Sequence, residues 1–321
     1  MAKRHKVSRR EFLEASGLAA SAAAAALAAT SRPAGAAEAM PHRTLGRTGA
    51  SVSILALGCG SRFLMYPAEQ ASEVLEKAMA LGITYLDTAI DYGKGESETR
   101  VGRVMARRRQ DVFLATKVPT RARTRETALR EVEASLKRLQ TDHLDLLHLH
   151  SLGKEDDLAR IEAPDGALEA LYELREQKVA RFIGMTSHTD GAVMATAIER
   201  HDLDCVQMAM NPARALRFEE LALPAARKKN LGIILMKVTA QDRLLGPGGA
   251  DPASLLRYAW TLPVSTVVCG MPKLEHLEAN VASARGFTPM PAPEVDRLRG
   301  RLAGRQVALE QFFAHHHDGM A

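Results

Sequence analysis

The 321-residue sequence is poor in cysteine and in aromatic side chains, and each shortage excludes a class of protein. Its three cysteines are odd in number and widely spaced, so they give no disulfide framework or metal-ligand pattern, and no metal is expected. Each lies in an apolar run, where it is expected to be a small buried hydrophobic residue. Aromatic residues make up 4% of the chain, so stacking platforms for single-stranded nucleic acid are not evident. The cysteines are Cys59, Cys205 and Cys269.

The chain also lacks an excess of charge once its N-terminus is set apart. The net charge is +5, but residues 1–36 hold six Lys and Arg side chains against two Glu, which leaves +1 for the rest. A basic surface for nucleic acid is therefore not predicted. The hydrophobic fraction of 46% and the charged fraction of 25% are ordinary for a globular protein with a sizeable core.

Residues 1–36 have the layout of an export signal, with a basic segment, an Ala-rich stretch and a small-residue site, "AGA", at 34–36. The alternatives are a disordered basic tail and a membrane anchor, but the stretch is too Ala-rich and interrupted for a spanning helix. We expect a twin-arginine signal peptide (1–36), the twin-arginine export machinery as a partner, and a periplasmic mature domain (37–321) without stable membrane insertion. The segment "SRREFLEASG" resembles the twin-arginine motif, which centres on Ser8, Arg9, Arg10, Phe12 and Leu13.

After residue 36, a short apolar run followed by a stretch of helical periodicity recurs eight times. This alternation predicts parallel βα units, and near-continuous apolar strands indicate a sheet covered on both faces. Eight such units in roughly 230 residues match a (β/α)8 TIM barrel, an α/β fold. A doubly wound sheet is the alternative, but "LALGCGSRF" lacks the glycine-rich phosphate turn that such a fold places after an early strand. The apolar runs are 53–60, 83–89, 111–117, 144–150, 181–187, 204–210, 232–238 and 265–270.

Local signals predict the boundaries of several elements. The segment 42–53 is expected to form a short N-terminal β-hairpin with its turn between Gly46 and Gly49. Hydroxyl side chains in "TRET" and "SETR" are expected to cap helices at their N-termini, and Gly82 is expected to end one. The tail 310–321 is expected to be a frayed end.

Polar side chains follow three neighbouring strands of the predicted barrel. Asp87, Lys117 and His150 end the second, third and fourth apolar runs, and Tyr92 lies in the loop after the second. Each has a structural alternative, such as a helix cap, a surface lysine or loop packing. Catalytic groups of such barrels come from the carboxyl ends of several strands, so the four together predict a proton-transfer site. Of the two histidines in "HLH", His148 lies deeper and is expected to be a satisfied core residue.

The sequence resembles the aldo/keto reductase family in motifs that cover roughly residues 42 to 285. The resemblance implies a barrel that binds a nicotinamide cofactor without a dinucleotide fingerprint, a small carbonyl substrate, and a catalytic tetrad of Asp87, Tyr92, Lys117 and His150. The motifs are "RTLGRTGASVSILALGCG", "YLDTAIDYG", "FLATKV", "DLLHLHS", "IGMTSH", "CVQMAMNP" and "TVVCGMPKLEHLEANV".

Carbonyl reduction needs these residue types. Hydride transfer leaves negative charge on oxygen, so a proton donor must stand beside it, here Tyr92. A lysine ammonium at about 4 Å, at an effective dielectric near 20, favours the phenolate by about 4 kcal/mol, or roughly three pKa units before desolvation. Asp87 would keep Lys117 charged and oriented, and His150 would hydrogen-bond the carbonyl oxygen. The second acid of the motif, Asp91, is expected to add only polarity to the turn.

The resemblance also assigns cofactor contacts. It places Thr186, Ser187 and Gln207 against the nicotinamide carboxamide, since all three side chains can hydrogen-bond an amide. Met236 stands where many members stack an aromatic ring, and Lys237 would meet the pyrophosphate. The segment 239–252 would form a lid over the cofactor or a plain flexible loop.

The last motif bears on cofactor choice. Asn280 matches the adenine contact of the family. Positions that commonly carry cations for the 2′-phosphate read Gly270, Met271 and His276, and Lys273 is the nearby cation. NADP is the expectation from the resemblance, with NAD or dual use open.

Two functions from different classes remain compatible with the tetrad. The first is an NAD(P)H-dependent reductase of aldehydes or ketones. The second is a nicotinamide-binding sensor or regulatory subunit with slow turnover, and a lyase or isomerase with tightly held cofactor is a third reading. Arg121, Arg123 and Arg125 in one loop either favour an anionic substrate or are simply solvated.

Overall fold

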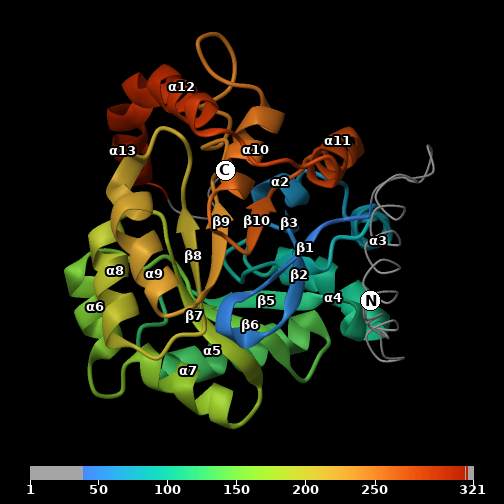
Figure 1. The fold of residues 1–321 in the computed structure, drawn as a ribbon. Helices are drawn as coiled ribbons and strands as arrows, with labels where there is room; N and C mark the ends of the chain where they lie inside the picture. The colour runs from blue at the N-terminus through green and yellow to red at the C-terminus, as the bar shows by residue number, and fades with distance from the viewer. Residues whose placement is uncertain (1–38, 315, 317–321) are drawn as a thin grey trace, which may run out of the picture. The chain divides into compact units, whose positions relative to one another are not determined.

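The computed structural model describes residues 39–314 and 316, and the predicted export signal lies outside them. Eight parallel strands close into a barrel surrounded by helices, as Figure 1 shows. Each strand falls within one of the eight predicted apolar runs or overlaps it, so the (β/α)8 prediction is confirmed. In barrel order the strands are β10 (Thr266–Cys269), β3 (Leu55–Gly58), β4 (Tyr85–Asp87), β5 (Phe113–Val118), β6 (Leu144–Leu149), β7 (Ala180–Ser187), β8 (Cys205–Ala209) and β9 (Gly232–Met236).

The predicted N-terminal hairpin is also present, as β1 (His42–Thr44) paired with β2 (Ser51–Ser53). The buried Leu45 and Val52 of this hairpin pack with residues at the starts of the barrel strands, including Tyr85. The hairpin therefore closes the amino-terminal end of the barrel.

Helices follow the strands and cover them. Among the described residues, no helix is both long enough and apolar enough to cross a membrane. The α-helices are α2 (Ser61–Leu64), α3 (Ala71–Ala80), α4 (Glu96–Arg108), α5 (Arg125–Leu139), α6 (Glu155–Glu162), α7 (Ala167–Glu176), α8 (Gly191–Arg200), α9 (Leu223–Lys228), α10 (Pro252–Thr261), α11 (Leu274–Arg285), α12 (Ala292–Leu302) and α13 (Gln306–Ala314). Short 3-10 turns are η1 (Gly46–Thr48), η2 (Arg109–Asp111), η3 (Ala215–Arg217) and η5 (Ala303–Arg305), and η4 (Phe218–Ala222) is a π-helical turn before α9.

Of the predicted helix ends, those at Thr124 and Gly82 are confirmed and the cap at Ser97 is wrong. Thr124 caps α5 in a reciprocal pair with Thr127, and Gly82 follows α3 with a φ of 98° that disfavours other residues. Ser97 is not a cap, because α4 starts at Glu96 and the Ser97 hydroxyl donates to the carbonyl oxygen of Cys59 at 2.6 Å. That expectation was wrong because Ser97 faces the barrel, where a strand-end carbonyl needs a donor.

The prediction of a frayed tail over 310–321 is wrong for residues 310–314, which are helical. Helix α13 (Gln306–Ala314) buries Leu309 and Phe313, and the ring of Phe313 packs edge-on against His188 at 6.2 Å. Because His188 directly follows β7, the C-terminal segment lies at the end of the barrel toward which the strands point, and Figure 1 shows α12 and α13 on that side.

The barrel interior is apolar at its start and polar at its mouth. Side chains two apart in a strand share a face, so the rings of Tyr85 and Phe113, stacked at 5.2 Å, point inward with Asp87 and Lys117 farther along the same strands. On β6 the same alternation carries His148, which pairs in register with Lys117. A Cβ at Gly184 would lie 2.7 Å from Nδ1 of His148, so glycine is needed there to admit that ring.

Candidate active site

Lys117 stands at the centre of the polar layer at the mouth of the barrel. Its ammonium donates to Asp87 Oδ2 at 2.8 Å, to the Thr88 carbonyl oxygen at 2.8 Å and to the Tyr92 hydroxyl at 3.3 Å. These three acceptors match the three N–H donors of a charged lysine. Asp87 and Lys117 are 1% and 2% exposed, so the pair lies in a poorly solvated site where its electrostatic effect on the Tyr92 oxygen is strong.

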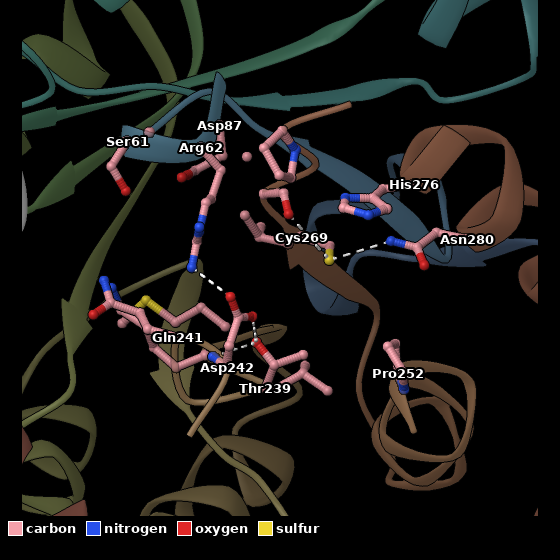
Figure 2. Close-up of a pocket in the computed structure, with 18 of the residues that line it drawn as sticks. Ser61, Arg62, Asp87, Thr239, Gln241, Asp242, Pro252, Cys269, His276 and Asn280 are labelled. Carbon is pink, nitrogen blue, oxygen red and sulfur yellow. Dashed lines mark hydrogen bonds and ion pairs between the residues drawn. The ribbon is translucent and has the colours of Figure 1, made fainter. Parts of the chain in front are cut away.

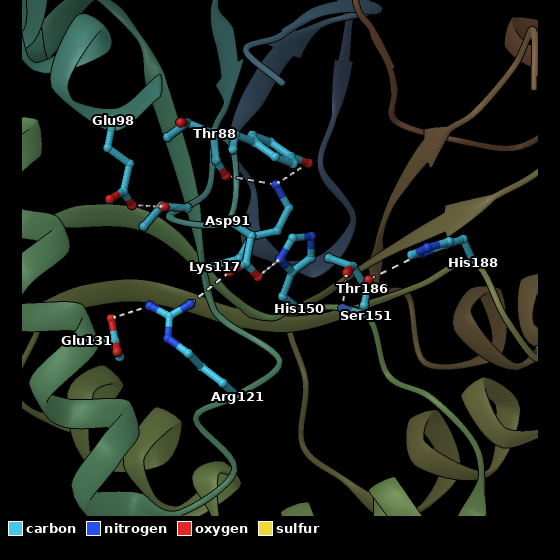
Figure 3. A network of polar contacts seen from close by, with 12 residues as sticks. Thr88, Asp91, Glu98, Lys117, Arg121, Glu131, His150, Ser151, Thr186 and His188 are labelled. Atoms are coloured by element: carbon cyan, nitrogen blue, oxygen red, sulfur yellow. Dashed lines mark hydrogen bonds and ion pairs between the residues drawn. The ribbon is translucent and has the colours of Figure 1, made fainter. Parts of the chain in front are cut away.

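His150 is the fourth member of the group. It directly follows β6, is buried, and its ring packs edge-on against that of Tyr92 with centroids 5.8 Å apart. The structure therefore brings Asp87, Tyr92, Lys117 and His150 together from three neighbouring strands and one loop, as the sequence predicted for a proton-transfer site. Figure 3 shows Lys117 and His150 of this group, with Thr88 and Asp91 beside them.

Asp91 is the residue that sequence reasoning underrated. Its Oδ2 lies 3.0 Å from Nδ1 of His150, and its Oδ1 accepts from Arg121 at 3.0 Å, as Figure 3 shows. Asp91 is thus attached to a member of the tetrad, and the expectation that it adds only polarity to the turn is wrong. The sequence contains no sign of this contact, because Asp91 and His150 are 59 residues apart in the chain.

His148 is buried as expected, but it is not satisfied. Neither ring nitrogen has a hydrogen-bond partner among the described residues. Burial, together with the charges of Lys117 and His150, holds the pKa of His148 well below its ordinary value. The ring is therefore a neutral element of the core beneath Lys117.

A cavity of about 350 Å³ opens beside the tetrad, a size at the lower end of small-molecule sites. Asp87 and Tyr92 are in its wall, together with residues of β3, β8, β9 and β10 and of the segments that follow β3, β9 and β10. Figure 2 shows this cavity. Six of the residues expected to contact the cofactor are in its wall: Gln207, Met236, Lys237, Gly270, His276 and Asn280.

The other three expected cofactor contacts are not in that wall. Thr186 accepts the Ser151 N–H at 2.8 Å, and Ser187 donates to the Leu152 carbonyl oxygen at 2.8 Å. Both hydroxyls therefore fix the loop that follows His150. Lys273 is exposed at the start of α11 (Leu274–Arg285).

The donor set of the cavity fits a nicotinamide dinucleotide. Gln207 is buried, its Oε1 has no hydrogen-bond partner among the described residues, and its Nε2 meets only the Met236 sulfur at 3.6 Å. The Asn280 amide likewise donates to a sulfur, that of Cys269, at 3.5 Å. Because sulfur is a weak acceptor, both side chains can form stronger hydrogen bonds with the amide and adenine groups of such a cofactor. Cys269, partly exposed in this wall, is not the buried residue that the sequence suggested.

Two further contacts across the cavity escaped the sequence analysis. Arg62, in the short helix α2 that follows β3, forms an ion pair with Asp242 in the segment after β9, as Figure 2 shows. The segment 239–252 is therefore tied to the opposite wall, and its Leu244 is fully buried. At the far end Lys237 Nζ lies 2.9 Å from Nε2 of His316. The sequence alone does not show which residues of these loops contact each other. The position of Arg62 after a glycine near the end of a strand was nevertheless a signal that it could line the site.

Arg121 and Arg123 of the loop after β5, and Arg125 at the start of α5, all have acidic partners. Arg121 contacts Asp91 and Glu131, and Arg125 contacts Glu173. Arg123 is buried, binds both carboxylate oxygens of Asp157 and donates to the His150 carbonyl oxygen at 2.8 Å. Their charges are neutralised within the protein, which removes the support for an anionic substrate.

Comparison with known proteins agrees with this geometry. The profile of the aldo/keto reductase family matches residues 55–253. Two uncharacterized oxidoreductases of Bacillus subtilis (strain 168) are similar: YrpG is 29% identical over 85% of this chain and 93% of its own, and YqkF is 36% identical over 46% of this chain and 49% of its own. The holo form of the aldo-keto reductase AKR11C1 from Bacillus halodurans aligns with a TM-score of 0.69 and 26% identity, over 82% of this chain and 96% of that one. With its closed eight-stranded barrel and a family match over most of it, the chain belongs to the aldo/keto reductase family.

Proposed function

We propose that this protein reduces aldehydes or ketones to alcohols, with NADP(H) as the cofactor and Tyr92 as the proton donor. The observation that carries the proposal is the buried contact between Lys117 and the Tyr92 hydroxyl beside the cavity. The sensor function has no observation of its own in its favour, because the tetrad contacts are those that turnover requires.

Each residue of the site has a separate role in carbonyl reduction. The bound nicotinamide supplies the hydride. Tyr92 gives its proton to the oxygen of the former carbonyl, and the Lys117 ammonium stabilises the negative charge that remains on the phenol oxygen. Asp87 holds Lys117 at 2.8 Å, and His150 hydrogen-bonds the carbonyl oxygen. Gln207, through its amide oxygen, would orient the nicotinamide, and Lys237 would meet the pyrophosphate.

The residues at the expected adenine end of the cavity limit how strong a cofactor preference can be. The wall there offers Asn280 and His276, with Arg62 already paired to Asp242, and Lys273 is the cation on the adjoining surface. NADP is proposed from family membership, and this sparse set of cations predicts only a modest advantage over NAD. Fluorescence titration with NADPH and NADH measures it directly.

Turnover with a carbonyl panel tests the function. At saturating NADPH we expect one cofactor oxidised per carbonyl reduced, with kcat in the range of about 1 to 10³ s⁻¹ that enzymes commonly show. Steady-state absorbance of the reduced nicotinamide gives the rate, and product analysis gives the stoichiometry. Tight binding of NADPH without turnover of any aldehyde or ketone would instead favour the sensor.

We also propose export through the twin-arginine route, with support from the sequence of residues 1–36 alone. Arg9→Lys combined with Arg10→Lys is expected to keep the protein in the cytoplasm, because that route depends on the arginine pair. Cell fractionation of the full chain and the variant measures the change. An equal periplasmic fraction for both would contradict the proposal.

Because this route carries folded proteins, the cofactor is expected to be exported bound to the protein. An assay of the periplasmic form for nicotinamide tests this expectation.

A further inference from the structure

The contact between Asp91 and His150 is not needed to assemble the Asp87–Lys117–Tyr92 group, yet it is well supported. Asp91 Oδ2 lies 3.0 Å from Nδ1 of His150, while Oδ1 lies 3.0 Å from Arg121. Arg121 in turn reaches Glu131 at 2.9 Å. Figure 3 shows this chain of contacts running outward from the tetrad. Asp91 is therefore held in place from both sides.

The carboxylate of Asp91 is ionised. Partial burial works to raise its pKa, but the hydrogen bond to His150, the charges of His150 and Arg121, and the Thr120 backbone N–H outweigh burial and hold the pKa of Asp91 below its ordinary value. An ionised carboxylate can only accept hydrogen bonds. The proton in the Asp91–His150 contact must therefore belong to Nδ1 of His150.

This proton position determines what the other ring nitrogen can do. A neutral imidazole carries one N–H, so a neutral His150 with its proton on Nδ1 presents a lone pair at Nε2. Such a ring accepts a hydrogen bond from an alcohol and cannot donate one to a carbonyl oxygen. Only the imidazolium ion, protonated on both nitrogens, donates from Nε2.

We propose that Asp91 is a positioning residue that fixes a proton on Nδ1 of His150, so that His150 holds a carbonyl oxygen as the imidazolium ion and an alcohol as the neutral ring. The proposal rests on the proposed function and deepens it. It makes the direction of catalysis depend on one proton of His150: carbonyl reduction is favoured at lower pH and alcohol oxidation at higher pH. The proton delivered to the product oxygen still comes from Tyr92.

The charges around His150 are compatible with an imidazolium ion. Among the described residues, four carboxylates (Asp87, Asp91, Glu131 and Asp157) pair with three cations, which leaves one surplus negative charge in this part of the network. Protonation of His150 cancels it. Among the residues that the structure describes, the groups around His150 are Asp91 and Tyr92 from the loop after β4, Lys117 from β5, Arg121 and Arg123 from the loop after β5, the neutral His148 from β6, Asp157 from α6, and His188 through Ser151.

Nitrogen-15 NMR of the histidine rings tests the proton position without any assay of turnover. The cofactor-bound protein is labelled, and the His150 resonances are assigned by their loss in His150→Gln. At high pH we expect the neutral ring to carry its proton on Nδ1. An Nε2–H ring in the wild-type protein would overturn the proposal, whether or not the enzyme reduces any carbonyl tested.

Asp91→Asn supplies the kinetic test. An amide can donate to Nδ1, which moves the proton of the neutral ring to Nε2 and lets it donate to a carbonyl. Measured from about pH 5 to about pH 9, kcat/KM for reduction is expected to decline with rising pH in the wild type and to lose that one-proton decline in the variant. Alcohol oxidation at high pH is expected to fall by about 10- to 100-fold, as for loss of a hydrogen bond to a charged group.

Glu173→Gln is the matched control, because it makes the same carboxylate-to-amide change at the partner of Arg125, outside the tetrad. It is expected to keep the wild-type pH profiles in both directions. If Asp91→Asn lowers both directions equally and leaves both pH profiles unchanged, Asp91 only supports the loop and the proposal fails. If the variant does not fold, the NMR measurement on the wild-type protein still decides.

Discussion

Tyr92→Phe is expected to lower kcat for carbonyl reduction by a factor of about 10² to 10⁴, the range typical of a lost general acid, while cofactor affinity stays the same. The phenol oxygen is the acceptor that Lys117 contacts at 3.3 Å, and phenylalanine leaves hydride transfer without a proton donor. The ring that packs against His150 is retained, so the shape of the site is preserved. Stopped-flow and steady-state absorbance give kcat, and fluorescence titration gives the cofactor Kd.

Tyr85→Phe is the matched control for that experiment. Tyr85 lies deeper on the same segment, and its buried hydroxyl has no hydrogen-bond partner among the described residues. Its removal is therefore expected to leave kcat unchanged and stability equal or higher. Wild-type turnover in Tyr92→Phe, or an equal loss in both variants, would contradict the assignment of Tyr92 as the proton donor.

The strand ends were predictable because parallel strands put their carboxyl ends at the same edge. Asp87, Lys117 and His150 each end or directly follow an apolar run, so one physical rule brings them together without any contact being known. Side chains two apart in a strand point to the same side. This period also explains why Tyr85 and Phe113 lie inside the barrel while Asp87 and Lys117 lie at its mouth.

What sequence could not predict depends on loop geometry. The contacts of Asp91 with His150 and of Arg62 with Asp242 join loops whose relative positions no period specifies. The hydroxyls of Thr186 and Ser187 form hydrogen bonds with the backbone of the loop that follows His150, which no pattern in the sequence indicated, and their contact with the cofactor stays a prediction. A polar side chain near a site can form its hydrogen bonds with the backbone or with a ligand, and the sequence pattern does not decide which.

The buried pair of Asp87 and Lys117 leads to the second large expected effect. Lys117→Met removes the ammonium that contacts Asp87, Thr88 and Tyr92 and leaves the Asp87 carboxylate buried and uncompensated. Breaking a buried ion pair from one side typically costs about 3–5 kcal/mol of stability. Reduction is expected to be abolished as well, because Tyr92 then lacks the cation that stabilises its anion. Urea unfolding followed by circular dichroism measures the stability, and Lys137→Met at an exposed ion pair, where little change in stability is expected, is the control.

Adding Asp87→Asn to Lys117→Met separates the structural role of the pair from its catalytic role. The double variant buries a neutral amide beside a methionine, so most of the lost stability is expected to return, since the cost came from an unpaired charge. Activity is expected to stay lost, because no cation remains near the Tyr92 oxygen. A double variant no more stable than Lys117→Met would show that packing of the lysine stem, rather than the charge of Asp87, carries the stability. A double variant with restored turnover would show that proton donation by Tyr92 does not depend on Lys117. We therefore expect the pair to stabilise the barrel only as a unit, and catalysis to depend on the lysine itself.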